Sequence, residues 1–213
     1  MKRYKGLLFD FDYTLADSSA GVAVCINHAL ANMGFAPVEK SRTDRTIGLS
    51  LAETFRELTG IAEDAQVQRL ATLFLEKADE VMVDMTVMLS GAVNAIPKLA
   101  ELGYSMGIVS TKRRRPIIEI LQRDNMDRYF TVIVGGGEVH MPKPNPEGVR
   151  MALKSMGLTP GTALYVGDSR TDAVTARNGE LDFAAVLTGV TEKEAFAGAV
   201  VFKNLEELAD ALG

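Results

Sequence analysis

Short apolar runs in this chain alternate with stretches in which apolar residues recur every three or four positions. Short apolar runs bounded by glycine or polar turn residues are typical of buried strands, and the longer period is typical of helices. The runs predict strands at 6–11, 105–109, 131–134, 163–166 and 183–186. The helical period predicts helices at 92–102, 116–123, 146–156, 171–178 and 205–212. This alternation indicates an α/β fold, doubly wound around a mainly parallel sheet.

The segment from residue 16 to residue 88 breaks the alternation, because its periodicity is helical throughout. Helical patterns cover 51–58 and 67–83, and Gly34 and Gly60 stand where helices would end. Before Gly34, an apolar stripe at helical spacing is formed by Val22, Cys25 or Ile26, Ala29, Leu30 and Met33. A helical segment of this length is too long for a simple crossover connection. We therefore predict a core domain of residues 1–15 and 89–213, with a small α-helical cap domain, 16–88, inserted into it.

The composition indicates which kinds of partner the protein can bind and which cellular compartment it fits. The chain has 213 residues, is 47% hydrophobic and 24% charged, and carries a net charge of −5, which argues against a nucleic-acid partner. Its single cysteine, Cys25, cannot form an internal disulfide and fits a reducing compartment. The apolar run behind the basic first residues stops at Asp10, too early for a signal peptide, and no run is long enough to span a membrane. We expect a cytoplasmic protein that binds neither nucleic acid nor membrane.

Polar residues follow most of the predicted strands at the point where each strand ends. The carboxyl ends of parallel strands meet at one edge of a sheet, where open α/β folds bind their ligands. Carboxylates gathered at one place repel each other unless a proton or a cation intervenes, and a hard divalent ion such as Mg²⁺ suits them. The residues that we expect at this edge are Asp10 and Asp12, Ser110 and Thr111, Lys143, and Asp168 and Asp172.

With these motifs in this order, the chain resembles the haloacid dehalogenase superfamily of phosphohydrolases. The resemblance rests on DFDYT (10–14), VST (109–111), Lys143 within MPKPNP, and GDSRTD (167–172), and it extends over nearly the whole chain. It implies a Rossmann-like core and a phosphoric monoester hydrolase that uses Mg²⁺. The helical segment resembles the mobile cap that phosphoglycolate-phosphatase-like members insert after the first motif.

The resemblance also implies roles for the acidic residues. Asp10 would attack phosphorus and form an aspartyl-phosphate, and Asp12 would protonate the leaving oxygen and later take a proton from water. Asp10, the backbone carbonyl of Asp12, and Asp168 would hold Mg²⁺. Asp172 would support the metal indirectly or through water.

A second group of residues would bind the transferred phosphoryl group. The Ser110 hydroxyl would donate a hydrogen bond to it, and Lys143 would neutralise both the nucleophile and the phosphate. The backbone N–H groups of Phe11, Asp12 and Thr111 are further candidate donors.

Substrate choice is the least determined feature, and four residues are candidates for it. Tyr13, where many relatives have glycine, either shapes the entrance or packs at the hinge. Lys112 either meets a second anionic group of the substrate or belongs to a solvated run of charge. Arg45 and Gly48 lie in a segment, TDRTIGLSL, that resembles the cap's specificity loop. Arg45 would then clamp a carboxylate or second phosphate, unless it only faces solvent.

The leading prediction is a Mg²⁺-dependent phosphatase that acts on a small phosphorylated metabolite through an aspartyl-phosphate, with phosphoglycolate as the best single guess. The alternatives are a pyrophosphatase or nucleotide-directed phosphatase, and a β-phosphoglucomutase-like phosphoryl transfer on the same scaffold. A haloacid dehalogenase is disfavoured because that reaction has no need for Asp12. The oligomeric state, monomer or dimer, stays open.

Overall fold

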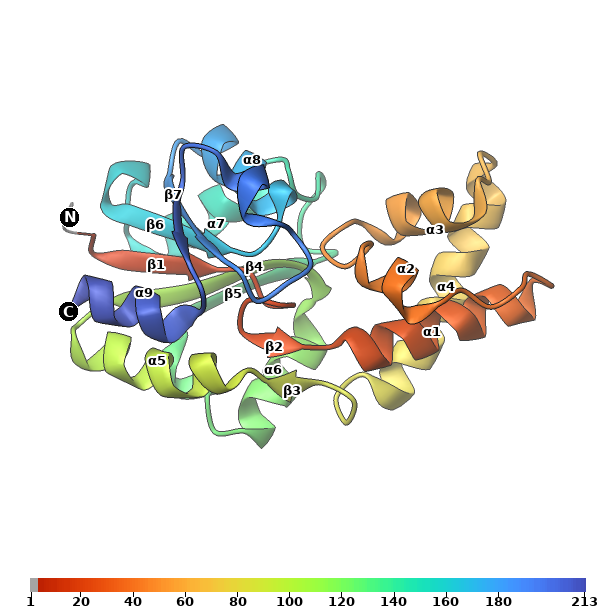
Figure 1. Cartoon of the computed structure of the whole chain (residues 1–213), viewed down its shortest axis with the longest axis horizontal. Coiled ribbons are helices and arrows are strands. Elements are labelled where there is room, and N and C mark those ends of the chain that lie inside the picture. Colours follow the sequence, from red (N-terminus) through yellow and green to blue (C-terminus); the bar gives the residue numbers. More distant parts are fainter. Residues whose placement is uncertain (1–3) are drawn as a thin grey trace.

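A parallel β-sheet forms the centre of the protein, as a computed structural model of residues 4–213 shows (Figure 1). Residues 1–3, part of the segment predicted for the core domain, lie outside the described residues. The sheet has the strand order β5-β4-β1-β6-β7-β8, with every neighbouring pair parallel. Its strands are β1 (Gly6–Phe9), β4 (Ser105–Arg113), β5 (Val132–Gly136), β6 (Ala163–Gly167), β7 (Asp182–Val186) and β8 (Val200–Phe202). The predicted fold class is confirmed.

Helices cover both faces of this sheet (Figure 1). One face packs against α5 (Ser90–Glu101), α6 (Arg114–Arg123) and α9 (Leu205–Leu212), and the other against α7 (Glu147–Met156) and α8 (Arg170–Asn178). Leu7 and Phe9 of β1 point into the first layer and Leu8 into the second, and all three are fully buried. Both faces of β1 are therefore apolar, which explains its uninterrupted hydrophobic run. Short 3₁₀ turns lie at η1 (Asp127–Tyr129), η2 (Pro160–Thr162) and η3 (Lys193–Phe196).

The strand boundaries differ from the predicted ones at the edge that matters for function. β1 ends at Phe9 instead of Phe11, because the Phe11 carbonyl accepts hydrogen bonds from the N–H groups of Leu15 and Ala16 and turns the chain. β4 continues beyond Val109 as far as Arg113, which makes Ser110 and Thr111 strand residues. The sequence analysis missed β8 and the two-residue strands β2 (Ala16–Asp17) and β3 (Val87–Met88). Elements this short leave too few residues for a period to show.

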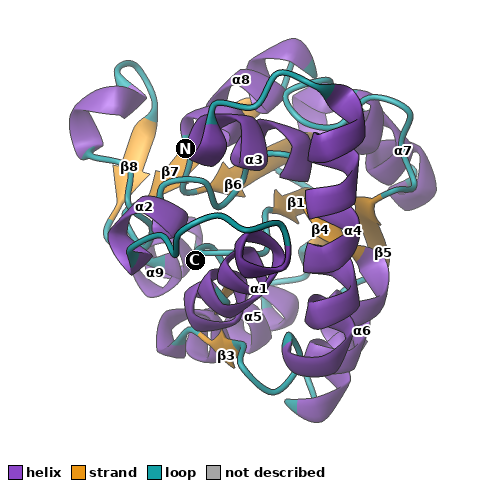
Figure 2. Cartoon of the chain, turned by 90° about the vertical axis from the view of Figure 1, so that its right-hand side faces the viewer, coloured by secondary structure: helices purple, strands orange, loops and turns teal. Residues whose placement is uncertain are grey.

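Four helices follow β2, and we call residues 19–81 the helical insert. They are α1 (Ser19–Asn32), α2 (Lys40–Asp44), α3 (Leu51–Thr59) and α4 (Asp64–Val81), and they surround their own apolar cluster, which includes Ile26, Phe55 and Leu70. The insert extends from the carboxyl ends of the strands, and the end-on view shows its helices in front of the sheet (Figures 1 and 2). β2 and β3 pair antiparallel and so bring the two ends of the insert together.

Local sequence sets the limits of the insert's helices. Ser50 begins α3 with a capping box, in which its hydroxyl and the Glu53 carboxylate each accept a hydrogen bond from the other's backbone N–H. Gly60 ends α3 in the left-handed conformation, with a φ of 73°, that glycine adopts without steric cost. Over residues 4–213, none of the helices combines the length and the apolar character needed to cross a membrane.

Candidate active site

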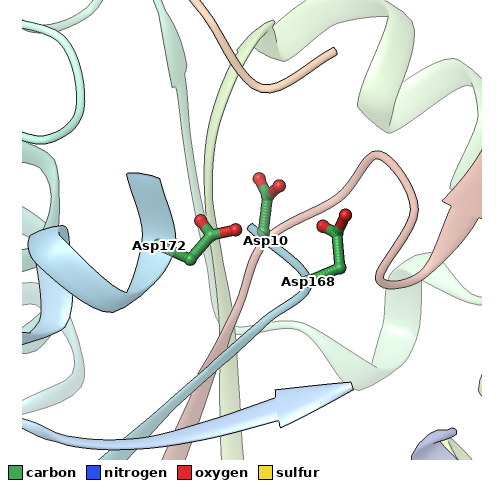
Figure 3. Close-up of side chains that lie close together, drawn as sticks. All are labelled: Asp10, Asp168 and Asp172. Atoms are coloured by element: carbon green, nitrogen blue, oxygen red, sulfur yellow. The ribbon is translucent and has the colours of Figure 1, made fainter. Parts of the chain in front are cut away.

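Three aspartates meet at the carboxyl ends of the central strands, and we call them the acid cluster (Figure 3). Asp10 follows β1, Asp168 follows the neighbouring strand β6, and Asp172 lies in the first turn of α8. One carboxylate oxygen from each lies within 4.8 Å of the others. All three residues are buried, with Asp10 2% and Asp172 0% exposed. Three of the predicted metal-site residues are therefore brought together.

The backbone determines how closely the acid cluster packs. The N–H of Asp10 donates to the carbonyl of Val166, which continues the β1–β6 pairing for one more residue. Ser169 and Asp172 form a capping box at the start of α8, so the Asp172 carboxylate folds back toward the end of β6. A Cβ on Gly167 would lie 2.5 Å from the Asp172 side chain, so glycine is required between Val166 and Asp168.

Lys143 is the buried cation of the acid cluster. Its ammonium nitrogen donates hydrogen bonds to Asp172 Oδ1 at 2.7 Å and to the Tyr165 hydroxyl at 3.3 Å. It also lies 2.8 Å from Asp10 Oδ1 as an ion pair. Burial disfavours the charged lysine, but Asp10 and Asp172 outweigh this effect and hold the pKa of Lys143 well above its ordinary value. Its charge is thus placed beside the predicted nucleophile.

The positive charge of Lys143 alone does not neutralise the three carboxylates of the acid cluster. Burial, opposed by Lys143 and reinforced by Asp172 and Asp12, raises the pKa of Asp10 to about 7. Burial and the charges of Asp172 and Asp10 likewise raise the pKa of Asp168 well above its ordinary value. The cluster of negative charge therefore favours a proton or a second cation.

The donor set fits a hard divalent cation. Asp10 Oδ1 is buried, and among the described residues it receives no hydrogen bond of ordinary geometry, although Lys143 lies beside it as an ion pair. Within residues 4–213, the one hydrogen bond to Asp168 Oδ1 comes from the Thr14 hydroxyl at 3.2 Å. Both Asp172 oxygens are occupied, because Oδ1 accepts a hydrogen bond from Lys143 and Oδ2 accepts hydrogen bonds from Ser169. Asp10 and Asp168 are thus free to ligate, whereas Asp172 is suited to hold Lys143.

Asp12 lies apart from the acid cluster and faces the helical insert. Its Oδ1 accepts hydrogen bonds from the Ser18 hydroxyl at 2.6 Å and from Lys112 Nζ at 3.1 Å. Lys112 is itself nearly buried, with its side chain 8% exposed, and its nitrogen lies 6.0 Å from the centre of the Phe11 ring. Asp10 and Asp12 are two residues apart in the sequence, but their carboxylates therefore have different hydrogen-bond and charge partners.

A cavity of about 110 Å³ separates Asp12 from the helical insert. Asp12, Thr111 and Lys112 form its polar side, and Gly48 forms part of the opposite side. The remaining wall is largely apolar. Most of it comes from the insert, through Val22, Ile26, Leu51, Phe74, Leu75 and Ala78; Met82 follows the last helix of the insert, and Arg113 and Pro116 come from the core. Lys112 and Gly48, two of the residues predicted for substrate choice, therefore both line this cavity.

The other predicted binding residues lie outside the described lining of the cavity. Arg45 is exposed and does not belong to the described lining of the cavity. Tyr13 is buried and is not among the described residues that line the cavity. Ser110 is 6% exposed, and its hydroxyl accepts a hydrogen bond from the N–H of Lys112. Phe11 is fully buried, so only its backbone is suited to bind a phosphoryl group.

Comparison with known proteins decides the family. The model of the haloacid dehalogenase-like hydrolases matches residues 7–186, most of the chain. The chain belongs to this family.

Relatives within the family are named as phosphatases. A phosphoglycolate phosphatase from Rhodobacter capsulatus is 30% identical, over 95% of this chain and 94% of the relative. A pyrophosphatase PpaX from Listeria innocua is also 30% identical, over 97% and 94%. A solved structure from Bacteroides fragilis, described as a haloacid dehalogenase-like hydrolase, has a TM-score of 0.93 and 34% identity, with 97% of this chain and all of that chain covered. The protein is thus a haloacid dehalogenase-like phosphatase.

Several residues of the phosphatase contact the predicted site residues and were missed by the sequence analysis. The loop after β7 passes over the acid cluster, and a Cβ on Gly189 would lie 1.9 Å from Asp168 Oδ2. Thr188 in the same loop donates a hydrogen bond to the carbonyl of Tyr13, which has a φ of 59°. Ser18 and Tyr165 were also missed. Gly189 and Thr188 follow an apolar strand at its carboxyl end, and this position was the available signal.

Proposed function

We propose that this phosphatase hydrolyses a small phosphorylated metabolite through an aspartyl-phosphate on Asp10, with Mg²⁺ as its cofactor. The observation that supports this most is the pairing of Asp10 with Lys143 inside the acid cluster. A buried carboxylate next to a fixed positive charge can approach an anionic phosphoryl group that would otherwise repel it. The phosphatase relatives and the family support the same reaction class.

Asp10 and Asp12 would have separate roles in the reaction. An Asp10 oxygen forms a bond to phosphorus while the ester bond to the leaving oxygen breaks, and Asp12 gives that oxygen a proton. In the second half, Asp12 takes a proton from water, the water oxygen attacks phosphorus, and the bond to Asp10 breaks. Ser18 and Lys112 hold Asp12 toward the cavity side, where the leaving group would lie.

The remaining residues would orient the phosphoryl group and neutralise its charge. Ser110 and the backbone N–H groups of Phe11, Asp12 and Thr111 would bind phosphoryl oxygens. Asp10, Asp168 and the Asp12 carbonyl would hold Mg²⁺, and the bound ion supplies charge neutralisation for the phosphoryl group. Asp172 holds Lys143 in place and so supports this arrangement indirectly.

The helical insert would act as the cap that selects the substrate. Its apolar residues close one side of the cavity, and the modest volume favours a small leaving group. Lys112 carries a positive charge at that boundary, which favours a leaving group with an anionic part. Phosphoglycolate, a small ester with a carboxylate, meets both conditions and is the substrate that we propose.

Inorganic pyrophosphate is a second candidate substrate. Relatives named pyrophosphatase PpaX from Bacillus velezensis and Listeria innocua are 29% and 30% identical to this chain. Pyrophosphate also has a small anionic leaving group, so the cavity and Lys112 would suit it as well. Phosphate release from phosphoglycolate, pyrophosphate, nucleotides and sugar phosphates, measured in parallel, separates these substrates.

The nucleophile is tested by the variant Asp10→Asn. An amide at this position cannot attack phosphorus effectively, and we expect a loss of phosphatase activity of at least about 10⁴-fold, with circular dichroism unchanged. The control is Asp17→Asn, which changes a carboxylate outside the acid cluster and should keep activity within about threefold. Full turnover by Asp10→Asn would remove the proposed reaction. EDTA should abolish wild-type activity and Mg²⁺ should restore it.

A further inference from the structure

We propose that Tyr165 is a positioning residue for the reaction, because it holds the Lys143 ammonium group beside Asp10 through its hydroxyl. This inference rests on the proposed function, in which Lys143 is the cation next to the attacking carboxylate. Tyr165 lies in β6, is 0% exposed, and stays beneath the acid cluster instead of in the cavity.

The hydroxyl of Tyr165 connects elements that are far apart in the sequence. It donates to the carbonyl of Val109 at 3.0 Å, lies 3.3 Å from Asp172 Oδ1, and accepts a hydrogen bond from Lys143 at 3.3 Å. Val109 directly precedes Ser110, the hydroxyl proposed to bind the phosphoryl group. One oxygen atom therefore contacts the strand that carries Ser110, the loop that carries Lys143 and the helix that carries Asp172.

The Lys143 ammonium group shows why this contact matters. It has three N–H groups and three oxygen neighbours: Asp172, Tyr165 and Asp10. The first two are hydrogen bonds and the third is an ion pair. Asp172 alone would leave the ammonium group free to pivot about a single hydrogen bond. A second, fixed acceptor removes this freedom and directs the charge at Asp10.

A tyrosine suits this position better than another carboxylate would. The acid cluster already holds three carboxylates, and a fourth would increase their mutual repulsion. A phenol supplies an acceptor without charge, and burial, opposed by Lys143, keeps the pKa of Tyr165 well above its ordinary value. The ring is itself held by stacking on Phe183, with 6.4 Å between the ring centres. The stacking of the ring and the hydrogen bonds of the hydroxyl together determine where the hydroxyl lies.

The test compares Tyr165→Phe with Tyr104→Phe. The first variant removes the hydroxyl and keeps the stacked ring, so the fold should be retained. The control removes another tyrosine hydroxyl, which donates to the carbonyl of Leu212 at 3.3 Å, far along the chain from the acid cluster. We expect kcat of Tyr165→Phe to fall about 10- to 100-fold with KM within about twofold of wild type, because the hydroxyl touches no substrate. Tyr104→Phe should keep both constants.

A double-mutant cycle distinguishes positioning from a purely structural role. If Tyr165 acts through Lys143, then Tyr165→Phe should reduce kcat of the wild type but change the residual kcat of Lys143→Met by less than about twofold. A structural role would reduce kcat by the same factor in both backgrounds. The cycle is measured per folded molecule, with folding followed by circular dichroism, so partial unfolding of a variant does not obscure the result.

A crystal structure of Tyr165→Phe gives a second readout that does not depend on activity. We expect the Lys143 nitrogen to move away from its 2.8 Å position beside Asp10 Oδ1. Unchanged kcat in Tyr165→Phe, equal losses in both backgrounds, or an unmoved Lys143 would each overturn the proposal. The proposed function fails separately, because it requires loss of activity in Asp10→Asn, whatever the result at Tyr165.

Discussion

The two sides of the cavity are built on different physical principles. On the core side, Asp12 lines the cavity, and the acid cluster and Lys143 lie outside the described lining. All of them are held by hydrogen bonds and ion pairs of buried polar and charged groups. On the insert side, the lining consists mainly of apolar side chains held by packing. Hydrogen-bonded networks of buried charges tolerate little change, because a lost partner leaves a charge unpaired. Apolar packing tolerates exchange of side chains of similar volume.

We therefore expect the two sides to have separate roles. The core side would determine the reaction, and the insert side would determine which leaving group fits. Relatives with different names, a phosphoglycolate phosphatase and a pyrophosphatase PpaX, have similar identity to this chain. The predictions below change one side at a time.

Among the changes that follow, the largest effect is expected from Asp12→Asn on the core side. Asp12 would protonate the leaving oxygen and later deprotonate water, so its loss should lower steady-state turnover about 10²- to 10⁴-fold. p-Nitrophenolate leaves without a proton, so this substrate needs Asp12 only in the second step. Stopped-flow measurement should therefore show a burst of about one p-nitrophenolate per enzyme before the slow phase. Wild-type turnover, or a loss without any burst, would argue against these two roles for Asp12.

Cys25 tests the integrity of the insert side. It is fully buried in the apolar cluster, and burial, partly offset by Lys112 and Lys77, raises its thiol pKa from 9.0 to about 12. At pH 8 the folded protein should thus contain about a thousandfold less thiolate at this position than the unfolded chain. Labelling with a thiol reagent should be correspondingly slow in buffer and fast in urea.

The same raised pKa gives a sign for the dependence of stability on pH. The folded insert binds the thiol proton more tightly than the unfolded chain does. The contribution of Cys25 to stability is therefore complete below pH 9 and is lost as the pH rises toward about 12. Replacement by valine should make unfolding in urea less sensitive to pH above 9. Equal pH dependence in both proteins, or rapid labelling of the folded protein, would contradict this picture of Cys25.

The smallest effect is expected from Ala78→Leu, at the boundary of the two sides. Ala78 lines the cavity from α4, and the larger side chain would extend into a space of about 110 Å³. We expect kcat/KM for the bulky p-nitrophenyl phosphate to fall about 10- to 100-fold, and that for phosphoglycolate to change much less. The matched control is Ala65→Leu, on the exposed side of the same helix. Equal losses for both substrates would show that the insert does not select by size.

The sequence by itself determined the fold class and the residues of the acid cluster. Alternating apolar runs and helical periods are local patterns, and a parallel sheet with buried faces is the arrangement that satisfies them. Asp10, Asp168 and Asp172 follow strands or begin a helix, so their convergence at one edge follows from the topology. Lys143 was expected at this edge because it lies in the loop after a predicted strand. Its role beside the nucleophile came only from the resemblance, because no periodicity predicts the path of that loop.

Only the tertiary structure decided what each of these groups contacts. Tyr165 looks like an ordinary residue of a buried strand until the fold brings Val109, Lys143 and Asp172 to its hydroxyl. In the same way, Gly189 acquires its role because the loop after β7 passes over Asp168, which is distant in the sequence. Such contacts depend on the distance between side chains of separate elements, to within a few tenths of an ångström. Local patterns along the chain carry no information at that scale, because they record which face a residue occupies and not what lies opposite it.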